Sequence, residues 1–251
     1  MRGHMISFLP LQGTLSFWGE GGPEAAELKG ELSLSFSAER FCTGYNDGEH
    51  MHRCPILFPG KKQCAPCASR DISRMYTRLD YAGFEAAYEK FRGQQFSVYV
   101  TSFAHVLKCG VTRTARLHER VTEQGADFFA EIARTEDAES AYSIEYAAQQ
   151  AFGLRNGVTS SQKMKLLKIG PQRERIEQCV SRIIESGLLS GVEGEMKVNA
   201  LAHKVPAAFE EAREIEGAVT GNKGQLLFFR RDSSDFCINM AVKPGFSFST
   251  P

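Results

Sequence analysis

Four cysteines lie between positions 42 and 67 of this 251-residue chain, in the spacing C-x11-C-x9-C-x2-C. The residues between them include few apolar side chains and many that favour loops, so a hydrophobic core cannot by itself hold this segment in one conformation. Thiolates bind Zn²⁺ strongly, and a C-x2-C turn brings two sulfurs to one ion. We therefore expect a structural zinc ion at Cys42, Cys54, Cys64 and Cys67, with no coordination position left open for catalysis.

Two alternatives to this ligand set stay open. His50 or His52, in the stretch "HMHRC", could replace Cys54 as a ligand, or all four cysteines could be free and buried. The seven cysteines are an odd number and no export signal precedes them, which argues against a disulfide framework. The other three lie in apolar patterns, where cysteine usually packs as a small hydrophobe: Cys109, Cys179 and Cys237.

The composition is that of a globular protein, with 42% hydrophobic and 24% charged residues and a formal net charge of zero. A neutral total argues against bulk attraction to polyanions, but the charge is uneven. Residues 53–78 and 155–175 each carry six basic residues and one acid, which predicts local basic faces for binding or for solvation. No apolar run approaches the roughly 20 residues that span a bilayer, and no convincing signal peptide is present. We expect a cytoplasmic protein without a membrane partner.

The order of the sequence patterns predicts an α+β protein in three parts. Residues 1–80 form a β segment with the cysteine loop, in which residues 13–19 and 31–36 are predicted to be strands joined by a turn. Residues 81–190 form an α/β domain, with a helix over 84–92, paired strands over 96–103 and 106–111, a turn at Gly110, and two later helices. The later helices are predicted from two apolar stripes: Ala141, Ile144, Ala148 and Phe152, and then Ile176, Val180, Ile183, Ile184 and Leu188. Residues 191–251 form a β-rich segment interrupted by a helix over 206–216, where Pro206 suits a first turn.

The central segment places basic residues directly after a strand: Lys108, Arg113, Arg116 and Arg120. A phosphate site and a solvated face both explain this pattern. If it is a phosphate site, we expect Lys108, Arg113 and Arg120 to form one patch around Gly110. Glycine at 110 would allow the backbone to approach a phosphate closely. Tyrosine, arginine and glutamate are the residue types that a phosphodiesterase needs as a base, a cation at the phosphate and a ligand for the metal.

The order of these residues resembles the GIY-YIG nuclease superfamily. Tyr99 matches the tyrosine of the first strand, and "KCGVT" matches its Tyr/Lys-x-Gly-x-Thr turn, with Lys108 at the second tyrosine position as in a phage-type branch. The resemblance implies that Tyr99 is a base, Arg120 a phosphate-binding cation and Glu145 a ligand for Mg²⁺. It also assigns Gly110, Thr112 and, approximately, Asn156 to nucleic-acid binding. Gln124, in "EQGA", has no counterpart in the nuclease pattern, and we expect it to face the same pocket.

A broader likeness runs over residues 42–246. The stretches "LKCGVTR", "ERVTEQGA", "SIEYAAQQAF" and "GAVTGNKGQLLFF" resemble a prokaryotic family that is known only as a domain of unknown function. That likeness supports the zinc cluster and the central fold, and it implies no reaction.

Three hypotheses of function follow. The first is a metal-dependent phosphodiesterase that acts on RNA or DNA, and the second is a nucleic-acid-binding protein with no cleavage activity. The third is a tRNA-modifying or other enzyme that reuses the same pocket. The local basic blocks, the predicted zinc and the central motif favour nucleic acid as the partner.

Overall fold

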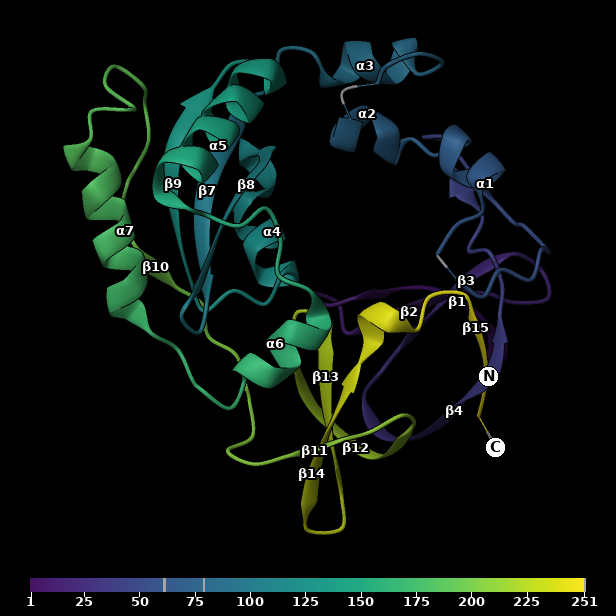
Figure 1. Ribbon diagram of the computed structural model, residues 1–251. Coiled ribbons are helices and arrows are strands. Elements are labelled where there is room, and N and C mark those ends of the chain that lie inside the picture. Colours follow the sequence, from purple (N-terminus) through teal and green to yellow (C-terminus); the bar gives the residue numbers. More distant parts are fainter. Residues whose placement is uncertain (61, 79, 251) are drawn as a thin grey trace. The chain divides into compact units, whose positions relative to one another are not determined.

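The structure is a computed structural model that describes residues 1–60, 62–78 and 80–250. Two compact units divide the chain, Met1–Lys90 with Lys204–Pro251 and, between them in sequence, Phe91–His203. Figure 1 shows helices together with extensive sheets, so the expected mixed α and β class is confirmed. No helix among the described residues is long and apolar enough to cross a membrane.

The first unit contains a nine-stranded sheet in the order β11-β14-β13-β12-β4-β15-β1-β2-β3. Its strands are β1 (Arg2–Leu9), β2 (Thr14–Trp18), β3 (Pro23–Glu27), β4 (Gly30–Arg40), β11 (Glu210–Glu211), β12 (Ile215–Lys223), β13 (Leu226–Arg231), β14 (Ser234–Asn239) and β15 (Phe246–Ser249). One hydrophobic cluster joins side chains from distant strands, including Leu15 of β2 and Ile238 of β14. The first and last parts of the chain therefore share one sheet and one core.

Two predictions in this unit are wrong. The chain does turn after Gly19, but this turn leads into β3 and not into β4, so β2 pairs with β1 and β3. The helix predicted over residues 206–216 is absent, and β11 and the start of β12 lie there. The Glu- and Ala-rich stretch favours a helix locally, but Ile215 is buried opposite Leu34 of β4, and this pairing outweighs the local propensity.

The cysteine loop leaves the nine-stranded sheet after β4 and contains a small hairpin and short helices. These elements are β5 (Tyr45–Asn46), β6 (Met51–His52), α1 (Ala65–Arg70) and α2 (Ser73–Arg78). The next helix, α3 (Glu85–Phe91), confirms the helix predicted over 84–92.

The second unit is a four-stranded antiparallel sheet with helices packed against it. The sheet has the order β10-β9-β7-β8, formed by β7 (Phe96–Phe103), β8 (Val106–Arg113), β9 (Phe128–Thr135) and β10 (Asn199–Ala200). The helices are α4 (Leu117–Glu123), α5 (Ala138–Phe152), α6 (Ser160–Leu166) and α7 (Arg173–Glu185). Of these, α5 contacts β7, β8 and β9, α7 contacts β7 and β9, and α4 contacts β8.

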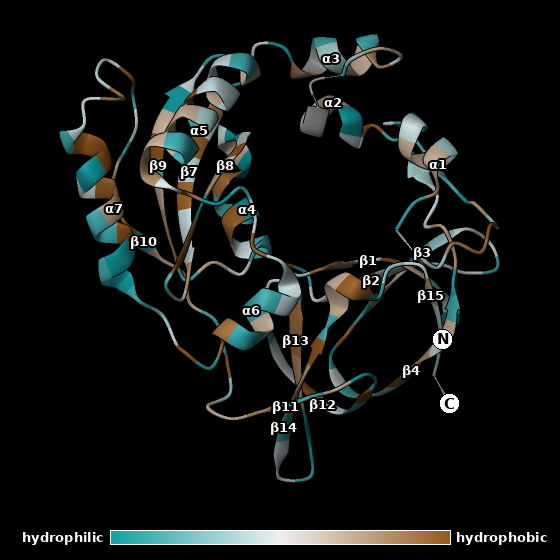
Figure 2. Ribbon diagram, viewed as in Figure 1, coloured by the Kyte–Doolittle hydropathy of each residue, from teal (hydrophilic) through white to brown (hydrophobic). Residues whose placement is uncertain are grey.

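Helices α5 and α7 follow the predicted apolar stripes. Ala141 and Ala148 of α5 and Ile176 and Ile183 of α7 are buried, and Figure 2 shows hydrophobic and hydrophilic segments alternating along α7. Ile184 was expected in the second stripe but is exposed, because it follows Ile183 directly and so points away from the buried face.

The two strands predicted over 96–103 and 106–111 form an antiparallel hairpin, but its turn is not at Gly110. The hairpin turns between Phe103 and Val106, where Ala104 has a left-handed backbone with φ of 50°. The carboxylate of Asp127 accepts a hydrogen bond of 2.7 Å from the Ala104 N–H, which stabilises this turn. Gly110 lies within β8.

Candidate metal centre and basic site

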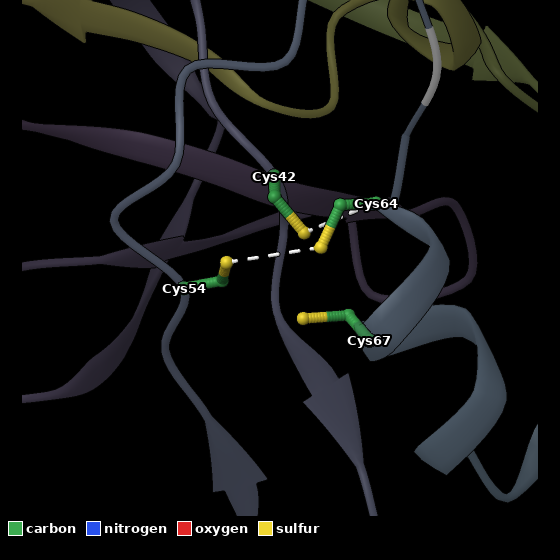
Figure 3. Close-up of side chains that lie close together, drawn as sticks. All are labelled: Cys42, Cys54, Cys64 and Cys67. Carbon is green, nitrogen blue, oxygen red and sulfur yellow. Dashed lines mark hydrogen bonds between the residues drawn. The ribbon is translucent and has the colours of Figure 1, made fainter.

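The four cysteines of the first unit come together at one point. Cys42 follows β4 and Cys54 follows β6. Cys64 is the N-cap residue of α1, and Cys67 lies within that helix. Segment 54–58 runs back along the end of β4, because Cys42 N–H donates to the Ile56 carbonyl and Phe58 N–H to that of Arg40. Figure 3 shows the four sulfurs directed toward a common centre from these separate elements.

The geometry of the sulfurs fits a tetrahedral metal ion. All four Sγ atoms lie within 4.8 Å of one another, and Cys54 and Cys64 are 3.9 Å apart. A zinc ion about 2.3 Å from each sulfur requires edges of about 3.8 Å, whereas a disulfide requires about 2.05 Å. The four side chains are buried, so the cluster is able to hold a metal such as zinc.

Backbone groups support the sulfurs as anionic ligands. The N–H groups of Gly44 and Cys64 donate to the Cys42 sulfur at 3.4 and 3.3 Å. Burial raises the pKa of the Cys42 thiol, so a nearby cation is needed to favour the thiolate. Gly44 has φ of 79°, and a Cβ there would lie 1.9 Å from the His52 carbonyl oxygen, so only glycine fits this position.

The histidines lie outside the group of sulfurs. His52 Nε2 lies 2.6 Å from Asp47 Oδ2, and its ring stacks on Tyr45 with centroids 4.5 Å apart. His50 is exposed, and its N–H donates to Asp47 Oδ1. Cys54 is therefore the fourth member of the group, and the other three cysteines are buried separately, as expected.

The second unit holds a basic site around Tyr99 of β7. Tyr99 is 1% exposed and packs against Val121 of α4 and Phe129 of β9. Its register partner on β8 is Gly110, and a Cβ at that position would lie 2.7 Å from Tyr99 Oη. Gly110 therefore provides space for the tyrosine ring, which is a different reason for glycine from a turn or a phosphate approach.

Lys108 and Gln124 lie beside this tyrosine. The Lys108 ammonium lies 5.8 Å from the centre of the Tyr99 ring and donates to Gln124 Oε1 at 3.1 Å. Gln124 Nε2 in turn donates to Tyr99 Oη at 2.8 Å. The expectation that Gln124 faces the same pocket as Lys108 therefore agrees with its contacts.

Arg120 and Glu145 complete the group from two helices. Burial raises the pKa of Tyr99, and the positive charge of Arg120 opposes that effect. Burial, together with the charge of Arg120, lowers the pKa of Lys108 to about 8, while Glu145 of α5 acts in the opposite direction. Burial raises the pKa of Glu145, against the charge of Lys108, and Gln149 donates to Glu145 Oε1 at 3.1 Å. Tyr99, Lys108, Arg120 and Glu145 are thus electrostatic neighbours.

The remaining predicted residues are spread more widely. Thr112 shares the Tyr99 face of β8, whereas Arg113 alternates to the other face and donates to Gln94. Arg116 is paired with Glu119 and Glu123. Asn156 is exposed. It follows Arg155, whose backbone forms an isolated parallel β-bridge with Lys108. The single patch that was expected around Gly110 therefore includes Lys108 and Arg120 but not Arg113.

The sequence did not single out Lys163 or Tyr142. The Lys163 ammonium donates to the main-chain carbonyl of Gln124, and the charge of Glu145 acts on Tyr142. Lys163 belongs to the basic block 155–175, which predicted a basic surface without identifying the residue that reaches the site. Beside Gln124, a cavity of about 10 Å³ has room for about one water molecule and is lined by both Lys108 and Lys163.

These features define an α+β protein with a buried four-cysteine cluster able to hold a metal in one unit and a basic, tyrosine-centred site in the other. The family model described as "Protein of unknown function (DUF2797)" matches residues 30–247, and the chain belongs to that family. No curated protein and no solved structure matches the chain.

Proposed function

We propose that this protein acts on nucleic acid and that the site around Tyr99 binds a phosphate of the nucleic-acid backbone. The observation that carries the proposal is the convergence of Lys108 and Arg120, from a strand and a helix, on one tyrosine. Phosphate contacts supply most of the sequence-independent affinity of nucleic-acid-binding proteins. The resemblance to GIY-YIG nucleases, which rests on the order of Tyr99, Lys108, Gly110, Arg120 and Glu145, motivates the same proposal.

Phosphodiester hydrolysis is the reaction that we propose for this site. Glu145 is a half-buried carboxylate beside the two cations, and Mg²⁺ is commonly held by one or two carboxylates together with substrate phosphates. When bound, such an ion would stabilise charge on the phosphate oxygens. Lys108 and Arg120 would orient the phosphate, and Tyr99 would contact one of its oxygens. Glu145 acts on both Tyr99 and Lys108 and supplies one carboxylate, so the fit to Mg²⁺ depends on further ligands from water and substrate.

Zinc is the metal that we propose for the cysteine cluster, in a structural role. Four buried thiols with tetrahedral spacing leave no open position for a substrate. The ion would cross-link a loop that has little apolar content and so hold α1 against the end of β4.

Binding without cleavage is the second candidate function. It is favoured by the state of Tyr99, which is buried and hydrogen-bonded to Gln124. Burial raises the pKa of Tyr99, so the side chain stays a neutral phenol at neutral pH and is not available as a base. Incubation of the protein with single-stranded RNA, tRNA and duplex DNA, with Mg²⁺ or Mn²⁺, separates the two candidates. Cleavage of any substrate supports the first, and binding without cleavage supports the second. A protein that neither binds nor cuts these substrates would leave the third hypothesis, a different enzyme.

A further inference from the structure

Gln124 connects three side chains of the basic site that come from different elements. It is the C-terminal cap of α4, and it is followed by Gly125, which has a left-handed φ of 69°. Its main-chain carbonyl accepts a hydrogen bond from Lys163 of α6. The tight turn and this contact fix the backbone of Gln124, so its side chain is directed rather than free.

The identity of the neighbours determines which way the Gln124 amide faces. The Lys108 ammonium carries donors only, so the atom of Gln124 that lies 3.1 Å from it must be the carbonyl oxygen. The amide nitrogen therefore faces Tyr99, 2.8 Å from Oη, and the phenol oxygen is the acceptor of that hydrogen bond. Arg120 of α4, whose positive charge also acts on this hydroxyl, carries hydrogen-bond donors only.

Because the Tyr99 oxygen accepts from Gln124, the Tyr99 O–H is left to donate to a group other than Gln124. No hydrogen bond from Tyr99 Oη to an acceptor occurs within the part of the chain that the structure describes. Two carboxylates are near Tyr99. Glu131, its register partner on β9, accepts from Arg134 and Ser97. Glu145 acts on Tyr99 through its charge and accepts from Gln149. Lys108 and Arg120, the two cations beside Tyr99, carry hydrogen-bond donors only, so the acceptor that fits is an anionic oxygen.

We propose that Gln124 is a positioning residue of this site, which holds the Lys108 ammonium and turns Tyr99 so that its phenolic O–H is donated to a phosphate oxygen. The identity of the ligand rests on the proposed function, but the arrangement of donors and acceptors does not. Tyr99 then acts as a neutral hydrogen-bond donor and not as the base that the nuclease resemblance implies. This also accounts for a glutamine in "EQGA" that the nuclease pattern does not explain.

The test is an NMR titration of Lys108 in the ligand-free protein, assigned by comparison with Lys108→Arg. Because Gln124 Oε1 stabilises the charged ammonium, Gln124→Leu should move the Lys108 titration to lower pH and Gln124→Glu to higher pH. If the amide nitrogen faced Lys108 instead, Gln124→Leu would move the titration to higher pH. An upward shift or no shift in Gln124→Leu would overturn the proposal. The matched control is Gln95→Leu, because Gln95 is an exposed glutamine of the same unit and donates to Glu136. This control should not shift the Lys108 titration.

A second measurement concerns the phosphate. Inorganic phosphate, followed by ³¹P NMR, should bind Tyr99→Phe and Gln124→Leu several-fold more weakly than the parent protein. If Gln124→Leu does not fold, Gln124→Glu is measured in its place, and unchanged phosphate affinity in both Tyr99→Phe and Gln124→Glu would contradict the donor role. A Lys108 shift of the expected sign without any phosphate binding would uphold the positioning role and count against the proposed function alone.

Discussion

Tyr99 and Gly110 face each other on adjacent strands, and the absence of a side chain at Gly110 is what lets the tyrosine hydroxyl reach Gln124. A Cβ at position 110 would lie 2.7 Å from Oη and 2.8 Å from the ring carbon that bears it. The pair is buried, so neither side can move without disturbing the sheet or α4. The shape of the basic site therefore depends on one glycine.

Gly110→Ala should displace Tyr99 and lower the free energy of unfolding by about 1–3 kcal/mol, the usual cost of overpacking a core. Urea denaturation measures this loss, and phosphate binding should weaken in parallel. Gly157→Ala is the matched control, because a Cβ there meets no atom within 4 Å. Equal stability of the two variants would show that the tyrosine does not need the space.

Protein purified without added zinc should contain about one zinc ion per chain, because four thiolates at tetrahedral spacing retain the ion through purification. Elemental analysis of the purified protein checks this. A fully folded protein without metal would contradict the assignment.

Cys64→Ser should destabilise the protein more than Cys179→Ser does. Loss of a ligand releases both the metal and the loop that it cross-links, whereas Cys179 is a buried side chain of α7 with no role in the cluster. Thermal unfolding of both variants, each with its zinc content measured, makes the comparison. Equal destabilisation, with zinc retained in Cys64→Ser, would count against this ligand.

If the protein cleaves nucleic acid, Glu145→Gln should abolish metal-dependent cleavage while the fold is retained. Glutamine keeps the size and most of the helix propensity of glutamate but lacks the charge that would hold Mg²⁺. Cleavage rates with Mg²⁺, together with circular dichroism, check both parts. Glu139→Gln, an exposed change on the same helix, should leave the rate unaltered. A fully active Glu145→Gln variant would remove this residue from the reaction.

Phosphate binding should weaken as the pH rises through about 8, because burial lowers the pKa of Lys108 to about 8 and the ammonium loses its charge above that value. Lys108→Arg should bind phosphate almost equally at pH 7 and pH 9, since arginine stays protonated. Isothermal titration at the two pH values measures this. The same loss of affinity in Lys108→Arg would assign the pH dependence to another group.

The sequence was most informative where the chemistry of a residue type is narrow. Four cysteines predict a metal cluster without any knowledge of the fold, and the period of the apolar residues predicts α5 and α7. The prediction of a helix starting at Pro206 was wrong, because local propensity carries no information on the pairing of Ile215 with β4, which lies far away in the sequence. The role of Gly110 was also beyond sequence reasoning, since a glycine in a strand shows its purpose only when the residue opposite it is known.

The salt dependence of nucleic-acid binding tests the central claim most directly. Binding of a labelled single-stranded RNA is measured from low to high salt for the parent protein, Lys108→Ala, Arg120→Ala and the control Arg113→Ala, whose side chain lies on the other face of β8. Each lost phosphate contact should weaken binding and reduce the slope of log K against log salt by about 0.7. We predict reduced affinity and a flatter slope in the first two variants and a parent-like slope in the third. Parent-like affinity and slope in both Lys108→Ala and Arg120→Ala would contradict the account.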